Sequence, residues 1–213
     1  MERSAFLERI RGRLGEAPLA GAGADVAIPD DWAVEVDDLI ARFEGELIAV
    51  GGEFHRATPE GAGAVLAEIL DGRAGSKVLL TVEDGVPTGL SEAIASAGCD
   101  HLAWPQCGRA GAASADVGVT SARWAVAETG TVVVTAEPPG GRAPSLLPGA
   151  HVAFVPAQRL VATVADLFRR IGAAGELPSN LVLVTGPSKS ADIGMELALG
   201  VHGPGETHVV IVE

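Results

Sequence analysis

Two short runs of this sequence, Val78-Leu79-Leu80 and Leu181-Val182-Leu183-Val184, are apolar at every position. Successive side chains of a β-strand point to opposite faces of a sheet, so a strand without a polar face is expected where helices cover both sides. Other segments have helical spacing, such as the apolar stripe from Val36 to Leu47. Alternating strands and helices predict an α/β fold: an open, mainly parallel sheet with helices on both faces.

An antiparallel hairpin is expected in the middle of the chain. The β-rich segments Trp124–Ala127 and Thr131–Thr135 are separated only by Glu128-Thr129-Gly130. Such a connection is too short for the crossover that parallel strands require.

The remaining elements follow from the same patterns. Further strands are expected at residues 53–57, 77–82, 101–104, 117–120, 151–155, 181–185 and 208–212. Helices are expected at residues 2–14, 36–47, 58–70, 91–97, 161–171 and 190–199. Thr58 is a candidate N-cap for the third of these helices, with Pro59 in its first position.

One domain is expected for a chain of 213 residues. The first helix is followed by a linker of small residues bounded by proline, at residues 16–29. We therefore expect residues 1–30 to form an N-terminal helix and linker, and residues 31–213 to form the α/β domain.

The charge, the distribution of apolar residues and the cysteine content exclude several classes of function. A formal net charge of −13 disfavours binding to nucleic acids, which rests on Lys and Arg contacts to phosphates. No signal-peptide pattern and no run of roughly 18 apolar residues is present, so we expect a cytoplasmic chain without a membrane span. Cys99 and Cys107 are the only cysteines, too few to supply the four thiolates of an iron–sulfur cluster.

Glu128-Thr129-Gly130, at the predicted hairpin tip, is the first candidate site. Gly130 permits a positive φ and close approach of a ligand to the backbone. Glu128 offers a carboxylate that can act as a base, a nucleophile or a hydrogen-bond acceptor. The simpler interpretation is a solvated glutamate in an ordinary hairpin turn.

The second candidate site is Thr185-Gly186-Pro187-Ser188-Lys189-Ser190, between a predicted strand and a predicted helix. A strand–loop–helix step directs backbone N–H groups at a ligand above the sheet, and Lys189 adds a cation for a carboxylate or phosphate. Asp192 lies near the expected helix start, where an acidic side chain stabilises the helix dipole. The alternative is a capped helix N-terminus without a ligand. Neither the P-loop spacing nor the dinucleotide-binding glycine pattern is present.

His202 lies in the glycine-rich loop Gly200–Gly205 and is the third candidate. His202, Glu206 and His208 together could suggest a metal site, but no regular geometry supports it. A structural loop is therefore favoured, and no metal is expected. The remaining histidines are interpreted as packed or edge residues of strands: His55, His101 and His151.

Several blocks within residues 112–213 resemble the LUD-domain signature of lactate utilization proteins. The blocks are Asp116–Thr120, Ala125–Val134, Leu146–Pro156, Thr185–Ile193 and Leu199–Pro204. Their order and spacing make the resemblance specific, whereas one block alone would be weak. The length and the few cysteines resemble the small, C-type subunits rather than the B-type subunits, which pair this domain with iron–sulfur ligands. Lys189 and Ser190 depart from the pattern, in which Arg and Thr are expected, and a lysine cannot form a bidentate fork.

The resemblance implies a fold similar to the NagB/RpiA/CoA-transferase group and a role in the oxidation of L-lactate to pyruvate. It implies partners, an iron–sulfur B-type subunit and a cysteine-rich A-type subunit, and no cofactor in this chain. The leading hypothesis is an accessory subunit that binds a small carboxylate or another anion. The residues assigned to ligand binding are Thr129, Gly130, Gly186, Ser188, Lys189, Ser190, Asp192 and His202, with Glu128 as the candidate catalytic residue.

Two alternatives stay open. An acyl-transferase-like, CoA-transferase-like or isomerase-like enzyme would use Glu128 as nucleophile or base, with the loop Gly186–Ser190 holding an anion. A small-molecule-sensing module would bind a ligand without contacting DNA. We also expect Glu128 and the loop Gly186–Asp192 to share one pocket.

Overall fold

The computed structural model describes residues 3–16, 37–81, 87–104, 106–136, 141–173, 178–190 and 197–213. The chain divides into two compact units, Met1–Trp32 and Ala33–Glu213. In the first unit the expected N-terminal helix is α1 (Arg3–Glu16), on which Phe6, Leu7 and Ile10 are exposed. Residues 17–36, which hold most of the predicted linker, lie outside the described residues.

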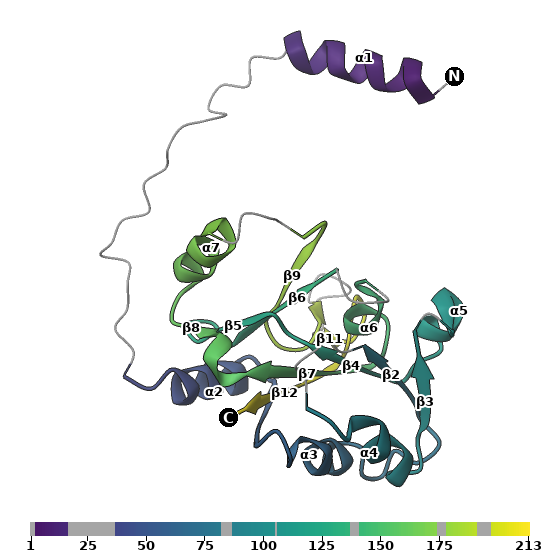
Figure 1. Cartoon of the computed structure of the whole chain (residues 1–213), viewed down its shortest axis with the longest axis vertical. Coiled ribbons are helices and arrows are strands. Elements are labelled where there is room, and N and C mark those ends of the chain that lie inside the picture. The colour runs from purple at the N-terminus through teal and green to yellow at the C-terminus, as the bar shows by residue number, and fades with distance from the viewer. Residues whose placement is uncertain are drawn as a thin grey trace. The chain divides into compact units, whose positions relative to one another are not determined.

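The second unit is built around a six-stranded sheet in which every neighbouring pair is parallel (Figure 1). Its strand order is β1 (Glu53–Ala57), β12 (Glu206–Val212), β7 (Ala150–Pro156), β4 (Val117–Ser121), β2 (Lys77–Thr81) and β3 (Asp100–Ala103). The last strand of the chain thus lies between the first strand and β7. The predicted fold class, a mainly parallel sheet in an α/β domain, is confirmed.

Helices α3 (Ala62–Ile69) and α4 (Leu90–Ser96) cover one face of this sheet (Figure 1). Their buried side chains pack in one core cluster with residues of the central strands, such as Val119 and Phe154. Helix α2 (Leu39–Ala49) covers the opposite face with Phe43 and Leu47, which are fully or almost fully buried. Full burial of such a side chain contributes about 1.5–3 kcal/mol. Two short helices that the patterns did not predict are α5 (Gly108–Ala113) and α6 (Ala143–Leu146).

A second, four-stranded sheet shares the α2 side of the core. Its order is β8 (Leu160–Val161), β5 (Trp124–Val126), β6 (Thr131–Thr135) and β9 (Leu181–Val184). Strands β5 and β6 are antiparallel and form the predicted hairpin. Helix α7 (Val164–Ala173), which follows the short 3₁₀ helix η2 (Ala157–Arg159) and β8, packs Leu167 and Ile171 against this sheet.

Strand β9 differs from its prediction. The sequence predicted a strand covered on both sides, but β9 pairs antiparallel with β6 at an edge of the second sheet. Leu183 is 41% exposed there. An unbroken apolar run reports that a segment can be buried, and it does not say on which sheet or at which edge the strand lies.

Other boundaries also shift. The helix expected at residues 190–199 is not seen in the described part of that range, where β10 (Lys189–Ser190) pairs antiparallel with β11 (Ala198–Leu199). Helix α3 begins at Ala62, because Thr58 Oγ1 accepts a hydrogen bond from the Gly61 N–H at 3.1 Å and closes a turn before the helix. None of the helices in the described part of the chain has the length and apolarity that crossing a membrane requires.

Candidate functional site

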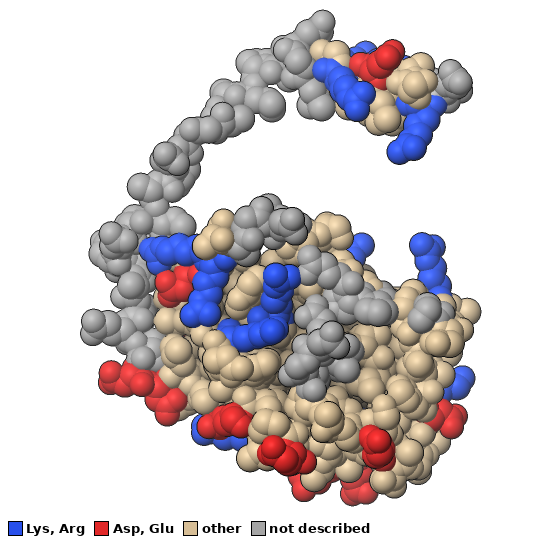
Figure 2. All heavy atoms as spheres, viewed as in Figure 1, with Lys and Arg blue, Asp and Glu red and all other residues tan. Residues whose placement is uncertain are grey.

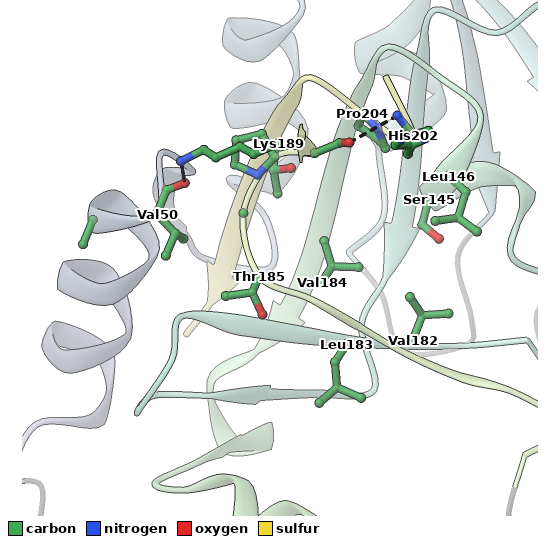
Figure 3. A pocket seen from close by; sticks show the side chains of 16 residues that line it. Val50, Ser145, Leu146, Val182, Leu183, Val184, Thr185, Lys189, His202 and Pro204 are labelled. Carbon is green, nitrogen blue, oxygen red and sulfur yellow. Dashed lines mark hydrogen bonds between the residues drawn. The ribbon is translucent and has the colours of Figure 1, made fainter. Parts of the chain in front are cut away.

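A pocket of about 570 Å³ opens between the end of α2, the loop after β9 and the segment before β12 (Figure 3). Of the residues singled out in the sequence, Gly186, Ser188, Lys189 and His202 lie in its wall. The other lining residues are Ala49, Val50, Ser145, Leu146, Val182, Leu183, Val184, Thr185, Pro187, Gly203, Pro204 and Thr207. The structure therefore brings together two candidate segments that the sequence could only name separately.

The loop after β9 is shaped by its contact with the end of α2. Gly186 has φ +71°, and a Cβ at this position would lie 2.9 Å from the Val50 carbonyl oxygen. Lys189 Nζ donates a hydrogen bond to the same oxygen at 2.6 Å (Figure 3). A cation at a helix C-terminus satisfies an unpaired carbonyl group and interacts favourably with the helix dipole. Lys189 therefore supports α2 while its side chain lies at the pocket.

The loop 200–205 is held against Ser188. The Ser188 N–H donates to the Pro204 carbonyl at 2.8 Å, and the Gly200 N–H donates to the Ser188 carbonyl at 3.0 Å. Ser188 Oγ also accepts from the His202 backbone N–H at 3.4 Å (Figure 3). Because that oxygen acts as the acceptor, its own proton remains available to donate to a ligand. His202 is exposed, so its imidazole can reach a ligand in the same pocket.

The charge of this wall suits an anion. Among the described residues that line the pocket, Lys189 is the only Lys or Arg, and none is Asp or Glu. A second pocket, of about 460 Å³, lies where β7 and β12 end, and its wall includes Glu60 and Glu213 without a Lys or Arg. An anionic ligand is therefore better accommodated by the first pocket, since like charges repel.

Glu128 is not among the residues that line the first pocket. Its Oε2 accepts a hydrogen bond from the Val164 backbone N–H at 3.1 Å, at the start of α7. Thr163 and Asp166 form a reciprocal cap at the same helix N-terminus. The side chain of each residue accepts a hydrogen bond from the backbone N–H of the other. The Thr163 hydroxyl also donates to Asp166 and is the main reason that the pKa of Asp166 is lowered. The Glu128 carboxylate thus binds a helix N-terminus, and the structure does not bring it to the loop Gly186–Lys189.

The rest of the hairpin tip contacts protein groups. A Cβ at Gly130, where φ is +61°, would overlap the backbone of Glu46 and Leu47, so the close approach at this glycine is made by α2. The Thr129 and Thr131 hydroxyl oxygens are 2.7 Å apart, and Thr131 Oγ1 is also 2.7 Å from Thr185 Oγ1. Thr129 is therefore connected to the pocket wall through two hydroxyl hydrogen bonds.

Two predicted site residues remain. Ser190 lies in β10 opposite Ala198 and is not a lining residue of the pocket. Asp192 lies outside the described residues. The expected positive helix end at this loop is not present among the described residues, so side chains and loop N–H groups are what the pocket offers an anion.

The comparisons with known proteins agree with this fold. The family model of the LUD domain matches residues 40–212, which is most of the chain. The chain belongs to the LUD domain family. Lactate utilization protein C of Bacillus subtilis (strain 168) is 30% identical over 233 aligned residues, covering 99% of this chain and 95% of that protein. The protein of the same name from Geobacillus kaustophilus (strain HTA426) is 31% identical over 229 residues, with the same coverage.

A shorter match has a higher identity. Lactate utilization protein C of Halalkalibacterium halodurans is 42% identical over 106 residues, which is 48% of this chain and 46% of that protein. A crystal structure of a DUF162 family protein from Deinococcus radiodurans superposes with a TM-score of 0.61. That protein is 22% identical, and the match covers 85% of this chain and 100% of the other. At this identity the likeness supports the fold alone.

The LUD domain holds a second polar cluster, whose members the sequence patterns did not connect. Glu53 on β1 lies opposite His208 on β12, and His55 is two residues further along β1. His55 Nε2 is 3.3 Å from His208 Nδ1, which is 3.5 Å from Glu53 Oε2. His208 was considered with His202 as a metal site, whereas the structure puts His202 in the pocket wall and His208 beside β1. The sequence patterns could not predict this cluster, because they do not show that β1 pairs with β12.

Both histidines of this cluster favour the neutral form. Burial lowers the pKa of His208, although the nearby Glu53 acts in the opposite direction. Burial also lowers the pKa of His55, and the neighbouring His208 lowers it further. A neutral imidazole has one ring nitrogen with a lone pair, which can accept a hydrogen bond or bind a metal.

Proposed function

We propose that this protein takes part in lactate utilization as an accessory subunit that binds a small carboxylate in the pocket beside Gly186–Lys189. Two observations support this proposal, the first for its role and the second for its ligand. Relatives named lactate utilization protein C align over nearly their whole length. The pocket wall carries a lysine and no carboxylate among its described residues. That distribution of charge is the observation on which the ligand class rests.

A carboxylate such as L-lactate or pyruvate would find donors on two sides of this pocket. Lys189 uses one of its three N–H groups on Val50, which leaves the others for a ligand oxygen. The Ser188 hydroxyl and the exposed His202 imidazole lie in the same wall. A hydrogen bond to a charged group contributes about 1.5–3 kcal/mol. A single lysine acts as a point charge, so orientation of the carboxylate depends on Ser188 and His202.

The oxidation itself would be shared with partners. Conversion of L-lactate to pyruvate releases two electrons and two protons. In this proposal the electrons pass to iron–sulfur clusters of the partner subunits, and this chain holds the carboxylate. Its two cysteines do not supply a cluster. The proposal includes a cytoplasmic location, as expected for a complex of this kind.

Reconstitution tests the role as a subunit. The chain is mixed with the purified A-type and B-type subunits, and L-lactate-dependent reduction of an artificial electron acceptor is measured with and without it. The proposal expects co-elution of the three proteins and a rate that depends on this chain. A rate that is unchanged without it, together with no association, would contradict the role.

Ligand binding is tested separately by calorimetry with L-lactate, pyruvate and, as an uncharged control, lactamide. Lys189→Met should weaken carboxylate binding at least tenfold, which corresponds to about 1.4 kcal/mol. Ser188→Ala should weaken it by a smaller factor. Arg109→Met is the matched control, because it removes an exposed cation on α5, outside the pocket wall. Equal affinities for lactate and lactamide would remove carboxylate recognition from the proposal.

The Glu128-based enzyme hypothesis gains no support from the geometry. The Glu128 carboxylate is hydrogen-bonded to the start of α7 and lies outside the pocket wall. The sensing hypothesis has a distinct outcome in the same experiments: carboxylate binding without any effect on lactate oxidation.

A further inference from the structure

The side chains of Glu53, His55 and His208 lie on one face of the six-stranded sheet. The pocket beside Gly186–Lys189, here called the carboxylate pocket, lies on the opposite face. Neighbouring residues of a strand point to opposite faces, and Thr207 lies in the wall of that pocket. His208 therefore points to the other face, where Val210, in the same orientation, packs with the residues of α3 and α4. The two sites are separate, and what binds at one does not decide what binds at the other.

The three side chains meet because of the strand register. Glu53 and His55 are two residues apart on β1 and share a face, and His208 is the direct partner of Glu53 on the neighbouring strand. One oxygen and two nitrogens from these residues all lie within 4.8 Å of one another. Glu53 is exposed, His55 is half-buried and His208 is buried, so the cluster is open to solvent from the side of Glu53.

The separations fit a metal ion. Zinc binds imidazole nitrogen at about 2.0–2.1 Å and carboxylate oxygen at about 2.0–2.2 Å, so tetrahedral ligand atoms lie roughly 3.3–3.5 Å apart. His55 Nε2 and His208 Nδ1 are 3.3 Å apart, and His208 Nδ1 and Glu53 Oε2 are 3.5 Å apart. Two of the three separations therefore match the spacing that this ion requires, and all three ligand atoms lie within 4.8 Å of one another.

The far side of His208 is also arranged for coordination. Its Nε2 is buried without a hydrogen-bond partner, and Glu206 Oε2 lies 3.8 Å away. Arg73 holds this Glu206 carboxylate in place through an ion pair. A metal-binding histidine usually carries its proton on the other nitrogen and directs it at a carboxylate. With Nδ1 on a metal, the His208 Nε2–H would point toward Glu206.

We propose that Glu53, His55 and His208 form a binding site for one divalent transition-metal ion of the Zn²⁺ type, with its fourth coordination position open to solvent beside Glu53. This donor set suits zinc and cobalt better than calcium or magnesium, which prefer oxygen ligands. Glu53 supplies one negative charge to the ion. Acidic side chains also predominate along the side of the molecule that carries α3 and α4 (Figure 2). The site revises the expectation from the sequence that this chain binds no metal.

Cobalt titration of the full chain, stripped of metal with EDTA, tests the site. Tetrahedral Co²⁺ absorbs visible light far more strongly than hydrated Co²⁺, so binding and geometry are read together. We expect one equivalent of Co²⁺ per chain, displacement by one equivalent of Zn²⁺, and a higher Tm when Zn²⁺ is present. Glu53→Gln and His55→Gln should each weaken binding at least tenfold.

Two matched variants make the result specific. His101→Gln removes an exposed histidine on β3, and His202→Gln removes the exposed histidine of the carboxylate pocket. Both should retain the one-equivalent titration and the absorption spectrum. The proposal is overturned if wild-type protein shows no saturable uptake at one equivalent. It is equally overturned if uptake survives the combined substitution of Glu53 and His55. Since Glu53 is exposed, its variant separates loss of the metal from loss of the fold.

Discussion

The Glu128 carboxylate accepts a hydrogen bond from the Val164 backbone N–H at 3.1 Å, which ties the hairpin tip to the start of α7. Replacing Glu128 with Ala leaves that N–H without its acceptor and should lower the free energy of unfolding by about 1 kcal/mol. Glu128→Gln keeps a side-chain oxygen and should cost less. Urea unfolding of both variants measures the difference. A loss of lactate oxidation in Glu128→Gln at unchanged stability would instead restore a catalytic role for this residue.

Gly130 is the position in the hairpin at which a side chain is least tolerated. Gly130→Ala combines an unfavourable positive φ with overlap of α2, and should destabilise the protein by at least about 3 kcal/mol. Gly72 is the control, because it has φ +74° with no atom within 4 Å of the position of a Cβ. Gly72→Ala should cost only about 1–2 kcal/mol, from the backbone alone. Equal losses in thermal unfolding would show that α2 can move away from the hairpin.

The hydroxyl chain through Thr131 connects the hairpin to the pocket wall. Thr131→Val preserves the shape of this buried side chain and removes both of its 2.7 Å hydrogen bonds, to Thr129 and Thr185. We expect a loss of about 1–2 kcal/mol in chemical denaturation. Thr131→Ser keeps the hydroxyl and should retain the carboxylate affinity of the pocket. Weaker binding in the valine variant alone would show that Thr131 positions Thr185.

Stability should depend on pH through His151. This imidazole is fully buried, with Nε2 2.9 Å from Thr120 Oγ1, and burial lowers its pKa to about 4. The unfolded chain, with a histidine pKa near 6.5, takes up a proton before the folded chain does. The free energy of unfolding therefore falls as the pH drops from about 6.5 to about 4, by up to about 3 kcal/mol from this residue.

A pair of variants isolates that contribution from those of other titrating groups. His151→Gln should flatten the dependence of unfolding free energy on pH across this window, whereas His101→Gln, at an exposed position, should retain it. His55 and His208, whose pKa values are also lowered, act in the same direction, as does Glu206 at the acidic end of the window, and they contribute to the slope that remains. An unchanged slope in His151→Gln would mean that the pKa of His151 is the same in the folded and the unfolded chain.

The sequence by itself determined the types of most elements, the hairpin and the family. The stripe that contains Phe43 and Leu47 is helix α2, and Trp124 and Thr135 begin and end the paired strands around the short turn. These features depend on residues close together in the chain. Local periodicity and turn length report them directly, because they describe how one segment can bury its own apolar side.

Tertiary structure alone decided which segments became neighbours. Lys189 binds the carbonyl of Val50, 139 residues earlier, and His208 meets His55 across 153 residues. The apolar runs at residues 78–80 and 181–184 have equivalent patterns, yet Val78 lies in the parallel sheet and Leu183 on an exposed edge of the other sheet. A segment's own pattern indicates that it can be buried. Which strand it pairs with depends on how all the apolar faces pack into common cores, so strand order and the sites that it assembles become determined only when the whole chain folds.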